Sequence, residues 1–397
     1  MNVFSAAALL APHLDALVEF RREVHAHPET ARREIVTTRR IIDRLERAGL
    51  KPIPLPGTGV LCDLGDSGRM VALRGDIDAL PLPDDTGLPY ASRIPGVSHA
   101  CGHDVHTAAL LGAGLVLGEL AEAGQLPGRV RLIFQPAEEA MPGGALAVLA
   151  AGALDDVEAA FALHCDPHTD VGKVGSRVGA ITAATDYVTV RLSGDGGHTS
   201  RPHLTQDVVF ALGQVIVGVP AVLSRRIDAR AGAALVWGTV GAGSAANAIP
   251  TQGELSGTFR CLDNDVWETA GAVVTDAVRE IVGPYRVRAE VEYERGVPPT
   301  VNDGDAVEVL EAAVRDELGR DAIELTPQSL GGEDFAWILE KVPGAMARLG
   351  TRTPGGRSYD LHRPDFVADE RAIGLGARIL AATALRDLTV HSRTAPS

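Results

Sequence analysis

The stretch VALRGDID, Val71–Asp78, decides the fold. It begins as an apolar run and ends in two acids, Asp76 and Asp78. A short and nearly continuous apolar run predicts a strand that is buried on both faces, as in parallel sheets. Two other stretches have the same form, RVRLIFQ at 129–135 and VEAAFALH at 157–164. The three stretches therefore predict neighbouring strands of one mostly parallel sheet.

Helix-like segments separate these strands. Residues 104–123 are long and mostly apolar, a second helix is expected from Gly143, and an amphipathic helix is expected over residues 14–24. Short apolar strands that alternate with helices predict an α/β domain, with helices flanking a mostly parallel sheet. Ligands of such sheets bind outside the carboxyl ends of the strands. The acids and histidines that follow the three strands are therefore expected to share one site.

The pattern changes near residue 183, where YVTVRL at 187–192 alternates with period two. The elements expected next are a helix at 206–223, strands at 234–240 and 254–262, a helix at 263–282 and a strand at 285–293. This β-α-β-β-α-β order is that of a ferredoxin-like unit. We expect a catalytic domain of residues 1–182 and 297–397, interrupted by an inserted α+β domain of residues 183–296. After residue 297 the alternation of helices and apolar strands resumes, with helices expected from residue 305 and at 333–342, a strand at 346–350 and a final helix.

Charge and composition exclude several classes of protein. Lys and Arg number 37 and Asp and Glu 52 among 397 residues, a formal net charge of −15. A strongly acidic surface disfavours nucleic acid and anionic membranes as partners. No apolar stretch is long enough and free enough of charge to predict a membrane span, and the N-terminal apolar run lacks the basic flank of a secretory signal. The four cysteines form no CxxC pair, so free thiols in a reducing cytoplasm are expected.

The stretch HACGHDVH, His99–His106, is the first candidate site. Cys101 and His103 are separated by Gly102, which lets the backbone bend so that both side chains can point at one ion. A metal site, a thiol active site and a histidine-rich polar loop all fit this segment by itself. A lone cysteine is more often a small buried core residue than a ligand.

Further donors lie at the ends of the other strands. Glu138 and Glu139 follow the second strand in FQPAEEAMPGG, His164 ends the third, and His362 lies in YDLHRPDF. Singly, an acidic pair is commonly a solvated turn, and a histidine is commonly structural. Together the donors are numerous enough for a two-metal site. The five candidate ligands are Cys101, His103, Glu139, His164 and His362, which leaves Glu138 as a general base.

The order of motifs resembles the co-catalytic metallopeptidase family of aminoacylases and carboxypeptidases. Within that family it is most similar to the amidohydrolase branch, which contains hippurate hydrolase, indole-acetyl-amino-acid hydrolase and N-acetyldiaminopimelate deacetylase. The similarity covers nearly the whole chain and includes LRGDIDALPLPDDTGLPY, HACGHDVHTA, FQPAEEAMPGGA, ALHCDP, GGHTSRPH, GSAANAIP, GTFR, GGEDFA and LHRPDF. The resemblance implies a metal-dependent amidohydrolase that cleaves N-acyl amino acids to a free amino acid and a carboxylic acid. It also implies two divalent ions per subunit. The donor types leave the metal open, since a thiolate with imidazoles suits zinc, cobalt or nickel and carboxylates also admit manganese.

The resemblance also assigns roles. Cys101 matches a bridging ligand, Glu138 matches the base that activates water, and Asp76 matches an acid treated as catalytic that holds a ligating histidine. The inserted domain matches a lid that often forms homodimers, and in several relatives its histidine comes from the partner subunit. The lid positions that match substrate contacts are His198, Asn247 and Arg260.

Three other functions fit parts of the sequence. A dipeptidase or carboxypeptidase would use the same mechanism with a different pocket. A cysteine hydrolase would pair Cys101 with His103 or His106, but it leaves the acid pair and the distant histidines unexplained. A non-catalytic metal- or peptide-binding protein would not need Glu138. Asp195 and Arg363 depart from the usual family pattern at positions that bear on substrate charge.

Overall fold

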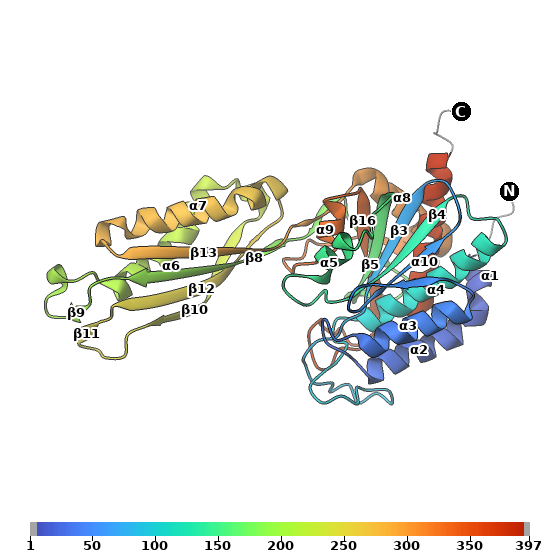
Figure 1. Ribbon diagram of the computed structural model, residues 1–397, viewed down its shortest axis with the longest axis horizontal. Helices are drawn as coiled ribbons and strands as arrows, with labels where there is room; N and C mark the ends of the chain where they lie inside the picture. The colour runs from blue at the N-terminus through green and yellow to red at the C-terminus, as the bar shows by residue number, and fades with distance from the viewer. Residues whose placement is uncertain (1–5, 393–397) are drawn as a thin grey trace. The chain divides into compact units, whose positions relative to one another are not determined.

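The computed structural model describes residues 6–392 and divides the chain into two units (Figure 1). The first unit comprises Met1–Gly179, Val301–Pro327 and Asp334–Ser397, and the second comprises Ala180–Thr300 and Gln328–Glu333. The second unit therefore includes one short segment, residues 328–333, that lies far from the rest of it in the sequence. Backbone hydrogen bonds fix this segment there, since the N–H of Ser329 donates to Ile181 and that of Ala183 to Gly331.

The first unit is built on an eight-stranded sheet with the order β1-β2-β4-β3-β5-β16-β6-β15. The four central strands, β4, β3, β5 and β16, run parallel, whereas β1 with β2, β2 with β4, and β16 with β6 are antiparallel. This confirms the mostly parallel sheet. The bounds are β1 Pro52–Pro54, β2 Val60–Leu64, β3 Met70–Asp76, β4 Arg129–Gln135, β5 Val157–Asp170, β6 Val174–Ser176, β15 Ile323–Leu325 and β16 Gly344–Arg352. Two short strands, β7 (Gly179–Thr182) and β14 (Thr300–Asn302), lie at the boundaries between the units in the chain.

Helices cover this sheet, and one long, mostly apolar helix among them is buried. α4 packs against α10 and β3, and most of its residues are buried, as expected of a helix that is apolar on all sides. The helices are α1 Ala6–Leu10, α2 Leu14–Ala26, α3 Ile35–Arg47, α4 His103–Glu122, α5 Gly144–Ala150, α8 Gly304–Leu318, α9 Ala336–Leu339 and α10 Arg371–Ser392. Short 3₁₀ helices occupy Ala11–His13 and Arg320–Ala322.

The helix expected at residues 333–342 is wrong, because α9 spans only Ala336–Leu339. The carboxylate of Asp334 instead accepts hydrogen bonds from Arg74 (Nη2, 2.8 Å), Gln135 (Nε2, 2.7 Å) and the backbone N–H of Ala145 (2.9 Å). These partners are distant in the sequence, so no local pattern reports them. They fix the chain at Asp334 before the first helical turn begins.

The second unit contains a four-stranded antiparallel sheet with the order β10-β12-β8-β13. Along the chain the order is β8-α6-β10-β12-α7-β13, which is the ferredoxin-like order. The bounds are β8 Ala184–Ser193, α6 Val208–Arg226, β10 Ala234–Ala242, β12 Gln252–Cys261, α7 Asn264–Val282 and β13 Arg288–Val297. A separate two-stranded antiparallel sheet pairs β9 Gly197–His198 with β11 Ala248–Ile249. Short 3₁₀ helices occupy Pro202–Leu204, Ala229–Ala231 and Gly283–Tyr285, and the last of these delays the strand expected from Tyr285.

Two helices, α4 and α6, are long and apolar enough to cross a membrane by length and composition alone. α4 is a core helix of the first unit, which accounts for its composition. α6 is different, because only a third of its most apolar window is buried. It exposes Val209, Phe210 and Val217, the last to 73 %. The outer face of α6 is therefore an apolar surface of the second unit.

Candidate active site

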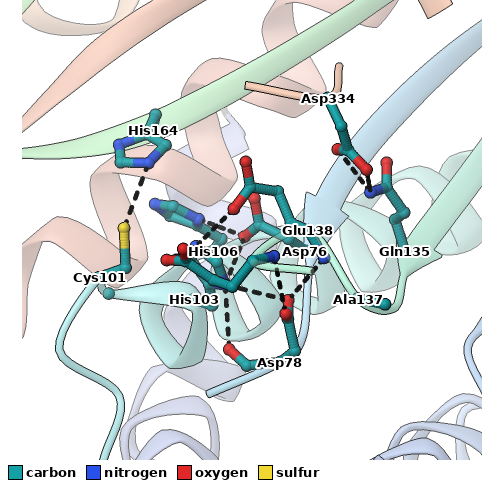
Figure 2. A network of polar contacts seen from close by, with 12 residues as sticks. Asp76, Asp78, Cys101, His103, His106, Gln135, Ala137, Glu138, His164 and Asp334 are labelled. Atoms are coloured by element: carbon teal, nitrogen blue, oxygen red, sulfur yellow. Dashed lines mark hydrogen bonds and ion pairs between the residues drawn. The ribbon is translucent and has the colours of Figure 1, made fainter. Parts of the chain in front are cut away.

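The candidate site lies in the first unit, where the loops that follow β3 and β4 meet the beginning of α4 and the strand β5 (Figure 2). Asp76 ends β3 and Gln135 ends β4, and the two residues are paired in the parallel register. Glu138 follows Gln135 by three residues, and His103 is the first residue of α4. His164 lies within β5, which continues to Asp170 rather than ending at the histidine as expected. The common edge of the parallel strands thus gathers segments that are distant in the sequence.

The structure brings together all five candidate ligands. The donor atoms of Cys101, His103 and His164 lie within 4.8 Å of one another, and so do those of Cys101, Glu139 and His362. Within these two triplets the Cys101 Sγ lies 3.6 Å from Nε2 of His164, and Nε2 of His362 lies 3.0 Å from Oε1 of Glu139. The thiol of Cys101 belongs to both triplets, which is the arrangement that a bridging ligand requires.

Unusual backbone conformations aim these side chains. Gly102 has a φ of +85°, and a Cβ there would lie 2.8 Å from Sγ of Cys165. His362 has a φ of +58° and donates its N–H to the carbonyl of Ala100 (2.8 Å), which ties the C-terminal loop to the Cys101 loop. Ala137, directly before the acid pair, has a φ of +57°. Positive φ values are uncommon outside glycine and concentrate at functional sites.

Asp78 orients the imidazole of His103. The Nδ1 of His103 lies 2.9 Å from the carbonyl oxygen of Asp78 and 3.3 Å from its Oδ1. The same carboxylate accepts the backbone N–H groups of Glu138 (3.1 Å) and Glu139 (3.0 Å). Nε2 of His103 is left buried, without a hydrogen-bond partner among residues 6–392. A buried ring nitrogen close to a thiol and carboxylates fits a metal ligand that loses its proton when the ion binds, so the side chains present here suit the implied group.

Asp76 was expected to hold a ligating histidine, but its strongest contacts lie elsewhere. Its Oδ1 lies 2.6 Å from Nδ1 of His106 and 3.8 Å from Nδ1 of His103, and its Oδ2 accepts from Arg74 (Nη1, 2.6 Å). Asp78 makes the closer contact with His103. The two acids are separated by one residue in RGDID, and spacing alone could not show which of them reaches the ligand.

The carboxylates around the site favour a cation over a free thiolate. Burial raises the pKa of the Cys101 thiol well above its usual value, and the charges of Glu139, Glu138 and Asp76 raise it further. A catalytic cysteine needs the opposite, a lowered pKa that yields thiolate. The structure therefore argues against a cysteine hydrolase. The same charges that oppose a thiolate here would be compensated by divalent cations.

The two imidazoles of the first triplet have different protonation tendencies. Burial lowers the pKa of His164 well below its usual value, and the charge of Arg348 lowers it further. His164 therefore keeps a lone pair that can bind a metal ion. Burial also opposes protonation of His103, but Asp76, Asp78 and Glu139 outweigh it and raise its pKa to about 10. Without metal, a proton on His103 compensates part of the negative charge of the site.

The substrate-contact candidates of the lid all lie in the second unit but not together. His198 pairs with Ala248 in the two-stranded β9–β11 sheet, where the N–H of Thr199 donates to the carbonyl of Asn247 (3.2 Å). Arg260, on β12, donates to Oγ1 of Thr185 (3.1 Å) and to a backbone carbonyl. β9 follows the end of β8 at which Ser193 pairs with Gln252, whereas Arg260 pairs with Thr185 near the other end of β8. Eight strand residues at roughly 3.4 Å each separate these ends by about 27 Å.

The two residues that depart from the family pattern lie on the surface. Arg363 follows the ligand candidate His362 and donates to Oδ1 of Asp365 (3.2 Å). Asp195 lies in the second unit, where its backbone N–H donates to Oε1 of Gln206 (2.9 Å). Because the Asp195 carboxylate is exposed, it is available to a substrate or a partner.

A buried ion-pair network holds the first turn of α4, next to His103. The Oδ2 of Asp104 lies 2.5 Å from Nε of Arg21 and 2.8 Å from Nδ1 of His25, both on α2. Burial opposes the ionisation of Asp104, yet Arg21 and His25 hold the pKa of its carboxyl well below its usual range. Asp104 therefore remains charged and fixes the end of α4 that carries a candidate ligand.

We expect Arg21→Met to destabilise the protein by about 3–5 kcal/mol, because it leaves a buried carboxylate with less compensation. The matched control is Arg22→Met. Arg22 pairs with Glu370 but is 48 % exposed, so its loss should cost only about 0–1 kcal/mol. Urea unfolding of both variants measures the difference. Equal losses in the two variants would show that burial of the Arg21–Asp104 pair contributes nothing.

The fold and the set of side chains define a metal-dependent hydrolase. The chain belongs to peptidase family M20/M25/M40, whose profile matches residues 72–386. It is 39% identical to the N-acetyl-L-cysteine deacetylase of Bacillus subtilis, over 90% of this chain and 84% of that protein. The solved structure of the YXEP protein of Bacillus subtilis, a dinuclear metal binding peptidase, is 33% identical, with a TM-score of 0.84 over 96% of this chain and 99% of that one.

A further relative is longer than this chain. It is the protein of Rhodococcus jostii named "Putative glutamate--cysteine ligase 2-3", 52% identical over 94% of this chain. That match covers 47% of the relative, so the chain spans about half of its length. The other two similar proteins named above are matched over most of their own length.

Proposed function

We propose that this protein hydrolyses the amide bond of N-acyl amino acids with two divalent metal ions, releasing a free amino acid and a carboxylic acid. The observation that carries the proposal is the pair of donor triplets that share Cys101. Glu138 lies beside them, with its Oε2 3.9 Å from Nε2 of His103. Thiolate and imidazole suit zinc, cobalt or nickel, and carboxylates also suit manganese.

The proposed roles follow from the positions of the side chains. When bound, the metal ions supply Lewis acidity, which polarises a carbonyl oxygen and acidifies water. Cys101, His103, Glu139, His164 and His362 hold the ions. Glu138 takes the proton of the attacking water and delivers it to the leaving amine. Asp78 holds the backbone of Glu138 in place. His198 and Asn247 are proposed to contact the substrate and its developing oxyanion, and Arg260 its carboxylate.

Amides of cysteine are the first substrates to test. The name of the Bacillus subtilis relative specifies N-acetyl-L-cysteine, and that of the Rhodococcus jostii relative specifies cysteine as one of two joined amino acids. An amide that contains cysteine is the chemistry common to both names. The four cysteines are buried and free of disulfide bonds, as is typical of proteins in a reducing cytoplasm, where the thiol of a cysteine substrate also persists.

A hydrolysis panel tests the proposal. It contains acetyl-, benzoyl- and indole-acetyl-amino acids, with N-acetylcysteine among them, and simple dipeptides. Each compound is tested before and after chelation, and then with manganese, cobalt, nickel or zinc restored. We expect metal-dependent release of the free amino acid from N-acyl compounds. Turnover of dipeptides alone would favour the dipeptidase alternative, and metal binding without turnover of any compound would favour a non-catalytic binding protein.

We also propose that the protein is a homodimer through its second unit. β10 is an edge strand of the sheet and exposes Val236 and Val240, and α6, which packs over β10 and β12, exposes Val217. An unpaired edge strand beside an apolar helix face suits a second copy, which would extend the sheet and cover the helix. The separation of His198 from Arg260 within the unit also supports a dimer, because a small substrate cannot contact both in one subunit.

Val236→Lys should convert the dimer to a monomer, since a charge on the edge strand opposes strand pairing. If the lid histidine acts on the partner's substrate, the monomer should also lose kcat by about 10²–10³-fold, the usual effect of removing one oxyanion donor. Light scattering and kinetics measure the two effects. Leu325→Lys, at a still more exposed position on the edge strand β15 of the first unit, is the control. A monomer with wild-type kcat would show that each subunit holds a complete site.

A further inference from the structure

His106 lies beside the candidate ligands but makes two short hydrogen bonds of its own (Figure 2). Its Nε2 accepts the backbone N–H of Cys165 at 2.7 Å. A backbone N–H can only donate, so this nitrogen must carry a lone pair and no proton. The proton of a neutral His106 then lies on Nδ1, which donates to Oδ1 of Asp76 at 2.6 Å. Both ring nitrogens are therefore used within the protein.

Cys165, whose N–H His106 accepts, also sets the ring of His164 through its carbonyl group. The carbonyl of Cys165 accepts from Nδ1 of His164 at 2.8 Å. This leaves the Nε2 lone pair of His164 facing Cys101, whose Sγ lies 3.6 Å away. The imidazoles of His106 and His164 are also in contact, with ring centroids 4.9 Å apart. Both the tautomer and the orientation of His164 thus depend on the backbone of Cys165, which His106 fixes through the N–H on the other side of its Cα.

The other end of this chain of hydrogen bonds is equally constrained. Oδ2 of Asp76 accepts from Nη1 of Arg74 at 2.6 Å. Arg74 in turn donates to Gln135 (3.0 Å) and Asp334 (2.8 Å). Arg74, Asp76 and His106 expose at most 3 % of their surface. Because these residues are buried, water does not compete for their hydrogen bonds. The carboxylate of Asp76 therefore presents a fixed acceptor to His106.

From this geometry we propose that His106 is a positioning residue that orients the metal ligand His164 through the backbone of Cys165, and that Asp76 acts by holding His106. The inference rests on the two-metal site of the proposed function. The competing possibility is that His106 is itself a ligand, since Asp76, His103 and His106 have donor atoms within 4.8 Å of one another. A ligand role would require Nε2 to release the buried N–H of Cys165, or Nδ1 to release Asp76.

Two substitutions separate these roles. In His106→Asn the side-chain amide takes the place of Nδ1, so it can donate to Asp76 but leaves the Cys165 N–H without its acceptor. In His106→Gln the longer side chain places its amide oxygen where Nε2 lay, so the Cys165 contact can be kept. Equilibrium dialysis against cobalt(II) measures how many ions each folded variant binds and how tightly, and circular dichroism checks the fold.

We expect both variants to bind two cobalt ions per chain at saturation. His106→Asn should weaken one of the two by about 10–100-fold, as loss of a group that orients a ligand does, while His106→Gln should remain close to wild type. A stoichiometry of one ion in either variant would overturn the proposal in favour of a ligand role. Equal losses, or no loss in either, would overturn the claim that the Cys165 contact transmits the effect.

A measurement on the unaltered protein decides the question if the variants fail to fold. In protein with ¹⁵N-labelled histidine, NMR reports the tautomer of each ring. We expect His106 to keep its proton on Nδ1 with and without zinc, whereas the Nε2 resonance of His164 should shift on zinc binding. An equal zinc shift at His106 would overturn the proposal. Both tests use the metal alone, so failure of every compound in the hydrolysis panel would affect the proposed function but not this result.

Discussion

Glu138→Gln should reduce kcat by about 10²–10⁴-fold, the usual contribution of a general base, and should leave two metal ions bound per chain. The amide keeps the shape of the side chain but cannot accept a proton. Because the lost interaction belongs to the transition state, kcat and kcat/KM should fall together while KM changes little. Stopped-time assays on the best compound of the panel, with metal analysis of the same samples, measure both quantities.

The adjacent residue provides the control. Glu139 lies 3.0 Å from His362 through its Oε1 and belongs to the second donor triplet, so Glu139→Gln should lower metal affinity instead. Excess metal should then restore part of the activity of Glu139→Gln and none of that of Glu138→Gln. A Glu138→Gln enzyme that turns over at the wild-type rate would remove Glu138 from the mechanism. Metal loss in that variant would make Glu138 a ligand.

Cys101→Ala should lower the affinity for both metal ions and abolish turnover at limiting metal, because its thiol is the one donor common to both triplets. Cys165→Ala is the matched control. Cys165 is also buried and forms no disulfide bond. Its Sγ contacts the carbonyl of Gly102 and belongs to neither triplet. Metal titration of the two variants after chelation compares them. Similar affinities in Cys101→Ala and wild type would remove Cys101 from the ligand set.

Cys101→Ala should also change the number of protons that metal binding releases. Near pH 7 the Cys101 thiol is protonated, because burial and the neighbouring carboxylates raise its pKa, and His103 is protonated because its pKa is about 10. Both must lose a proton to become ligands, so loading should release about two protons per chain. Metal affinity should therefore rise with pH until these groups ionise.

Titration calorimetry in buffers of different ionisation enthalpy counts the released protons. Cys101→Ala should release about one proton fewer than the wild-type protein, since only the imidazole remains to be deprotonated. Proton release that is unchanged by the substitution would show that the thiol does not ionise on metal binding. Affinity that is independent of pH would contradict protonation of both groups.

The amino-acid sequence by itself determined the strand pattern, the α/β class and the identity of the donors. Hydrophobic periodicity reports which side chains face a core, so the strands β3, β4 and the first part of β5 could be placed from local patterns. The motifs carry the donor types and their order along the chain. Since the carboxyl ends of parallel strands share one edge, even the convergence of Cys101, Glu139 and His164 could be expected.

Only the tertiary structure decided which histidine each of the two acids, Asp76 and Asp78, contacts. Asp78 rather than Asp76 contacts His103, and Asp76 instead holds His106, because the chain leaves the sheet between the two acids. The structure also shortened the helix expected at 333–342 to Ala336–Leu339, and Asp334 instead makes a buried contact with Arg74. These outcomes depend on hydrogen bonds between residues as many as 260 positions apart. Periodicity is a local property of the chain, whereas the pairing of buried polar groups is settled only when distant segments pack together.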